Sequence, residues 1–110
     1  MDRIKLDLRT DLAKVTPETL GPLGSCRYTA PCAIGAMLTP EQRRDVAAYD
    51  GGDGDTTFFD TLVRKDIFTV PAYQLADFVS LQNTFDRAKG DESRGRFFTT
   101  LTELKEKYSA

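Results

Sequence analysis

The segment Cys32-Ala-Ile-Gly-Ala-Met-Leu38 decides the fold of this chain. Its seven residues carry no charge and have small or aliphatic side chains. A folded chain can hide such a run from water only by passing it through the hydrophobic core. We therefore expect residues 32–38 to form the centre of the fold, with Gly35 allowing a second backbone to approach closely.

A helix-start signal follows this core segment directly. Thr39 is a good N-cap, Pro40 suits the first helical position, and Gln42 completes a capping box three residues after the cap. These residues predict a helix over residues 40–49.

The sequence Asp50-Gly-Gly-Asp-Gly-Asp55, named here the acidic turn, should end that helix. Its carboxylates suggest a calcium loop, but the spacing fails: counted from Asp53, the glycine that an EF-hand needs at position six is replaced by Phe58. We expect a turn between helices, with Asp55 or Thr56 capping the next helix, and no metal site.

Three helical patterns follow the acidic turn. The first ends near Lys65, the second runs from Pro71 to Lys89 with Gly90 as a left-handed stop, and the third closes the chain after a polar linker over residues 91–95. Residues 66–70 between the first two patterns should be extended, and Glu103 should pair with Lys107. The apolar stripes of the three helices are expected at Phe58, Phe59, Leu62 and Val63; at Leu75, Phe78, Val79, Gln82 and Phe85; and at Phe97, Leu101, Leu104 and Tyr108.

The N-terminal region fits two structures. Alternation of Ile4, Leu6 and Leu8 with polar residues indicates a short strand, whereas Leu8, Leu12 and Val15 also fit one side of a helix. A single helical turn should follow over residues 16–20, and residues 25–32 should form an extended or looped entry to the core segment.

These patterns together predict a mainly α protein, with α+β as the alternative. We expect one domain over residues 1–110, built as a compact bundle of about four helices with at most a short N-terminal strand or hairpin.

The amino-acid composition narrows the range of functions that this chain can have. The 110 residues contain no histidine, which removes the usual neutral-pH general base and the common zinc nitrogen ligand, so most hydrolytic triads and zinc sites are excluded. No apolar run has the length of a signal peptide or a membrane span, so we expect a cytoplasmic protein without membrane contact. No cofactor is expected. Cys26 and Cys32 could form a disulfide, but buried free thiols are the favoured interpretation.

Nucleic-acid binding has little support in the sequence. The net charge is −2 and the signs alternate, although a fold could still gather Arg43, Arg44, Arg94 and Arg96 on one face. The interleaved Arg94-Gly-Arg-Phe-Phe98 stretch suits single-stranded nucleic acid, but it also suits the entry of a helix with a core-facing phenylalanine.

Two segments resemble known proteins. The core segment followed by Thr39-Pro-Glu-Gln-Arg43, and the later Leu81-Gln-Asn-Thr-Phe-Asp86, resemble small uncharacterised proteins of phages and mobile elements that have a Cys-x-Ile-Gly-Ala-Leu segment and a Leu-Gln-x-x-His-Asp helix. Phe85 stands where that pattern has histidine. The resemblance implies a phage origin and no particular reaction.

We therefore expect a non-catalytic interaction protein, an inhibitor of a host defence complex similar to anti-CRISPR proteins, whose partner is a host protein. The alternative is a small ligand-binding or DNA-binding regulatory module, and an enzyme using carboxylates or Cys32 comes third. Large side chains left outside the predicted stripes, together with the acidic turn, give the expected partner-binding residues: Tyr73, Asp77, Arg87, Arg94, Arg96, Tyr108, Asp53 and Asp55.

Overall fold

The computed structural model describes residues 3–24 and 27–109. Its radius of gyration of 12.9 Å is close to the ~13 Å expected for a single folded domain of this length. The elements are, in chain order, β1 (Ile4–Lys5), α1 (Leu8–Asp11), η1 (Leu12–Lys14), η2 (Gly35–Met37), α2 (Pro40–Gly52), η3 (Asp53–Thr56), α3 (Phe59–Arg64), β2 (Phe68–Thr69), η4 (Ala72–Gln74), α4 (Leu75–Asp86) and α5 (Asp91–Tyr108). The prediction of a mainly helical fold with one short N-terminal strand is confirmed.

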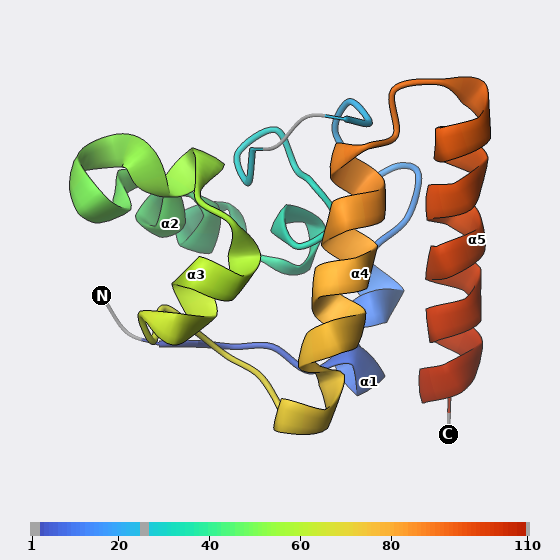
Figure 1. Cartoon of the computed structure of the whole chain (residues 1–110). Helices are drawn as coiled ribbons and strands as arrows, with labels where there is room; N and C mark the ends of the chain where they lie inside the picture. The colour runs from blue at the N-terminus through green and yellow to red at the C-terminus, as the bar shows by residue number, and fades with distance from the viewer. Residues whose placement is uncertain (1–2, 25–26, 110) are drawn as a thin grey trace.

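Helices α4 and α5 stand side by side on one side of the molecule, while α2 and α3 lie on the other (Figure 1). Strand β1 and the segment that follows it pass from the α3 side toward the start of α4 (Figure 1). None of the helices in the described residues combines the length and the apolar character needed to cross a bilayer.

The core segment lies at the centre, as predicted. Every residue from Cys32 to Leu38 is buried. Gly35 packs against the backbone of Tyr28, where an added Cβ would meet the Tyr28 carbonyl oxygen at 2.6 Å. In the same buried cluster, Phe59 stacks on Phe68 and on Phe78, with ring centroids 5.2 and 5.3 Å apart. Three aromatic rings from α3, β2 and α4 thus form a stack within the core.

The N-terminal region contains both of the structures that its pattern allowed. Ile4 and Lys5 form a strand, and Leu8 then begins a helical stretch whose first turn is capped by Asp7. The strand pairs in parallel with β2, with Ile4 opposite Phe68, so the hairpin alternative is wrong. Parallel pairing needs a long crossover connection, and here residues 6–67 supply it.

Helix α2 begins as predicted and ends later. Thr39 and Gln42 form the reciprocal capping box, and Pro40 is the first helical residue. The helix extends to Gly52 instead of ending at residue 49, and it ends there because Gly51 and Gly52 adopt left-handed φ values of 78° and 103° that turn the chain into η3. The prediction that Asp55 or Thr56 caps α3 is wrong, since its N-cap is Phe58 and no side chain makes a capping bond there.

The boundary between α4 and α5 differs from the prediction. Helix α4 ends at Asp86, and Gly90 has an extended φ of −133°, so Gly90 is not a left-handed stop. It is the N-cap of α5, where its N–H donates to Ser93 Oγ at 3.0 Å. Residues 91–95 are therefore the first turn of a helix and not a linker. Asp91 and Glu92 suit that position because the helix dipole favours negative charge at an N-terminus.

Candidate functional site

A groove lies between α4 and the start of α5. Its volume is about 780 Å³. Residues from η4, α4 and α5 line it: Ala72, Leu75, Ala76, Val79, Ser80, Asn83, Thr84, Arg87, Ser93 and Arg96. Its volume is far larger than the volumes of two pockets on the described surface that Phe58 lines, one of them together with Cys32.

The lining of the groove changes character along α4. Ala72, Leu75, Ala76 and Val79 make the end near the start of α4 apolar. Ser80, Asn83 and Thr84 follow, and Arg87 and Arg96 form the opposite end. A rise of about 1.5 Å per residue separates the apolar end from the cationic end by roughly 15–20 Å. The groove is thus elongated along α4, with an apolar end and a cationic end.

Helix α4 exposes this face because it carries two apolar stripes and the core uses only one. Phe78, Leu81 and Phe85 are fully buried, whereas Leu75 and Val79 are only half-buried. The sequence-based interpretation placed Leu75, Phe78, Val79 and Phe85 in one stripe with Gln82, and it did not include Leu81. The second stripe could have been found from Ala72, Ala76 and Ser80, which recur at four-residue spacing on one side of the helix.

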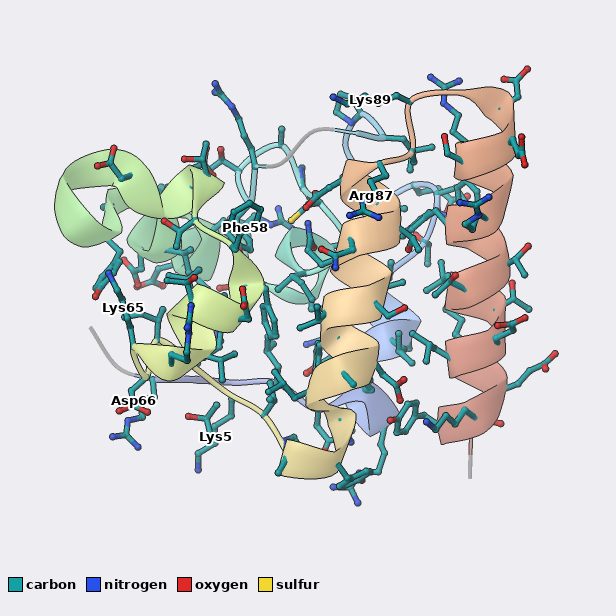
Figure 2. All side chains as sticks on the ribbon, in the orientation of Figure 1. Lys5, Phe58, Lys65, Asp66, Arg87 and Lys89 are labelled. Carbon is teal, nitrogen blue, oxygen red and sulfur yellow. The ribbon has the colours of Figure 1, made fainter. Side chains whose placement is uncertain are left out.

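An exposed phenylalanine extends the groove toward α3. Phe58 has 68% of its surface exposed, although its pattern predicted a place in the core. As the N-cap of α3 it has an extended backbone, so its ring is not on the buried side with Phe59. It lies beside Val79 and Asn83, which also line the groove. Figure 2 shows Phe58 next to α4, on the side of the helix toward α3, with Arg87 at the end of the same helix.

The structure brings together some of the predicted partner-binding residues. Arg87 and Arg96 meet at the cationic end of the groove. Tyr73 follows Ala72 at the apolar end and is 65% exposed, and its hydroxyl accepts a hydrogen bond from Gln74 Nε2 at 3.1 Å. Arg94 is exposed but does not line the groove.

Asp77 and Tyr108 are hydrogen-bonded to each other. The Tyr108 hydroxyl donates to Asp77 Oδ2 at 2.5 Å, and Lys107 Nζ donates to the same oxygen at 2.8 Å. Lys107 therefore pairs with Asp77 and not with the predicted Glu103. Burial raises the pKa of Asp77, but the two hydrogen bonds and the charge of Lys107 outweigh it and lower the pKa overall. Burial and the bond to Asp77 raise the pKa of Tyr108 to about 12. This cluster fixes the end of α5 to the start of α4.

The acidic turn lies apart from the groove. Asp53 is exposed, while Asp55 accepts hydrogen bonds from the N–H and the hydroxyl of Thr29 at 2.9 and 2.8 Å. Asp55 thus ties η3 to the loop before the core segment. Within the described residues, no group of three or more His, Cys, Asp or Glu side chains is placed to hold a metal ion.

Cys32 is buried in the core as a free thiol, and Cys26 lies outside the described residues. Burial raises the pKa of Cys32 to about 12. The backbone N–H of Gly35 donates to its sulfur at 3.4 Å, which fixes the thiol within the core segment. A thiol in this setting is a poor nucleophile at neutral pH.

The four arginines that a fold could have gathered on one face are separated. Arg43 and Arg44 lie on α2, whereas Arg94 and Arg96 lie on α5 at the far side of the molecule (Figure 1). Arg43 Nε also donates to the carbonyl oxygen of Gly35 at 2.8 Å, which commits that side chain to the core segment.

No protein-family model, curated protein or solved structure matches this chain.

Proposed function

We propose that this chain is a non-catalytic, phage-encoded protein that binds a component of a bacterial defence complex and blocks it, as anti-CRISPR proteins do. It would act in the cytoplasm of the host. One observation carries the proposal. A single face of the molecule combines the exposed ring of Phe58 with the groove of about 780 Å³ between α4 and α5. Aromatic and arginine side chains around an apolar centre are typical of protein interfaces.

The chemistry of the described residues favours binding over catalysis. Cys32 is the one described thiol, and burial holds its pKa near 12. Hydrogen bonds from Arg9 and Gln74 lower the pKa of Asp7, and hydrogen bonds also lower that of Asp77, so both carboxylates stay ionised and cannot donate a proton near neutral pH. The sequence has no histidine that could act as a general acid or base in their place.

The size of the chain and its resemblance to small phage proteins supply the rest of the proposal. A phage gains from blocking a defence complex with a small protein, since occlusion of one essential surface suffices. Such an inhibitor needs one rigid recognition face and no active site. The groove lies on two of the longest helices of the fold, whose packing against the core holds it in shape.

The proposal is tested by infection assays. The chain is expressed in a panel of bacterial strains, each carrying one defined CRISPR–Cas or restriction system directed against the same test phage. Inhibition of one system should raise phage plating on that strain by orders of magnitude and leave the other strains unchanged. The defence complex of that strain should then be recovered together with the tagged chain in fixed stoichiometry.

Matched variants connect that activity to the groove. Ala76→Trp places a large ring in the groove at an exposed position, whereas Thr102→Trp places the same ring on an exposed part of α5 that does not line it. The first variant should lose inhibition and the second should keep it, with both proteins folded by circular dichroism. Equal plating for both variants, or raised plating on no strain, contradicts the proposal.

A second candidate function is a small ligand-binding regulatory module. The volume of the groove falls within the ~300–1,000 Å³ typical of small-molecule sites. A panel of metabolites screened by thermal shift tests it, because a ligand that binds the folded state raises the melting temperature by mass action. A shift that Ala76→Trp abolishes and Thr102→Trp keeps favours this candidate.

A further inference from the structure

We infer that the groove between α4 and α5 binds one helix of a partner protein, a helix that is apolar along one face and carries acidic residues at one end. This inference rests on the proposed function and names the chemistry of the partner.

The apolar end of the groove calls for apolar side chains. Leu75 and Val79 are half-buried in the free protein, so a partner that covers them removes further apolar surface from water. Ala72 and Ala76 are exposed and have short side chains, which lets the backbone of a partner approach α4. Phe58 adds an exposed ring at the α3 side of the same surface.

The cationic end calls for carboxylates. Arg87 is exposed and makes no side-chain hydrogen bond or ion pair with the described residues. Arg96 pairs with Glu92 at 3.7 Å, but the two side chains are 68% and 92% exposed, and such a pair is weak and readily exchanged. Two guanidinium groups are therefore available at one end of the groove, and arginine prefers carboxylate partners that it can contact with two of its guanidinium nitrogens.

The shape of the groove favours a helix as the occupant. Helix α4 lines the groove along its length, and the start of the neighbouring antiparallel α5 lines one end of it through Ser93 and Arg96 (Figure 1). Two neighbouring helices leave a surface on which a third helix can pack, as in small bundles. The lining of the groove spans the length of α4, which corresponds to about three turns of a bound helix. Recognition of an amphipathic helix in a groove relies on apolar anchors three and four residues apart, with charges at the rim.

The experiment uses the full chain and a displayed library of peptides from bacterial proteomes, each about 16 residues long, enough for four helical turns. Selection is run in parallel on the natural protein, on Arg87→Glu/Arg96→Glu and on the control Arg94→Glu. The control reverses a charge on α5, the helix of Arg96, at a position outside the groove. The most enriched peptide is then synthesised with a fluorescent label, and its affinity for the three proteins is measured by anisotropy.

We expect enriched peptides with helical spacing of apolar residues and at least two acidic residues near one end. The double reversal should weaken binding by about thirtyfold, since it replaces two attractions with two repulsions. Arg94→Glu should change binding by less than about twofold. Ala76→Trp should abolish binding. Because this substitution changes no charge, it tests the apolar end of the groove independently of the double charge reversal.

The inference is overturned by any of these results: no enriched sequence class, enrichment of basic or uncharged peptides, equal losses in the two charge variants, or a dimer of the chain that Arg87→Glu/Arg96→Glu dissociates. Arginine-dependent binding of labelled single-stranded DNA in place of peptides also overturns it. Peptide binding does not require inhibition of any defence system. A groove that binds acidic helices in a chain that protects no phage therefore supports this inference and contradicts the proposed function.

Discussion

Gly35→Ala should destabilise this protein although it adds only one methyl group. The new Cβ would lie 2.6 Å from the carbonyl oxygen of Tyr28, while ordinary contacts of this kind begin near 3.4 Å. The two backbones would have to separate by 0.8 Å, the difference between these distances. Tyr28 cannot yield easily, because it is buried and its hydroxyl donates to the carbonyl oxygen of Thr57 at 2.9 Å.

The expected cost follows from these contacts. Overpacking of a core costs about 1–3 kcal/mol, and a clash with backbone belongs at the upper end of that range. Alanine also restricts the unfolded chain, which offsets about 0.4–1 kcal/mol. The net loss should be about 2 kcal/mol, which corresponds to a fall in melting temperature of roughly 10 °C for a domain of this size.

Gly95→Ala is the matched control. Gly95 lies in α5, and an added Cβ would meet nothing within 4 Å. Alanine is the better helix former, so this variant should gain about 1 kcal/mol. Urea unfolding followed by far-ultraviolet circular dichroism measures both changes. The reasoning is refuted if Gly35→Ala unfolds within about 0.5 kcal/mol of the natural protein while Gly95→Ala shows the expected gain.

Four further predictions follow from the core, the thiol, the α4–α5 contact and the acidic turn. Ile34→Asp should prevent stable folding, because an unpaired charge would enter the fully buried core, and a cooperative melt at the natural temperature would contradict this. In a Cys26→Ser background, a thiol reagent should modify Cys32 far more slowly in the native state than in urea, and equal rates would show an accessible thiol. The raised pKa of Tyr108 contributes stability that is complete below about pH 10 and is lost as the pH rises toward about 12, so Tyr108→Phe should reduce the alkaline loss of stability in pH-dependent melts; an unchanged loss counts against the bond to Asp77. Millimolar calcium should leave the melting temperature unchanged, and a rise would reveal a site at the acidic turn.

Part of the candidate site followed from the sequence. Arg87 and Arg96 are large side chains outside the predicted core stripes, and both line the groove. The apolar half of the groove did not follow, since Leu75 and Val79 read as core residues. An apolar position on a helix is buried only if another element covers it, and the sequence of α4 does not say how many of its faces are covered.

The sequence by itself determined the features that depend on neighbouring residues. An uncharged run had to be buried at residues 32–38, and Thr39 and Gln42 could close a capping box within one helical turn. Tertiary structure decided what depends on residues far apart. Ile4 pairs with Phe68 because the crossover returns the chain to that edge, and the buried Gln74 and Gln82 accept hydrogen bonds from the N–H groups of Leu8 and Ile34. The groove belongs to this second class, because it exists only where two separately formed helices come to rest against the same core.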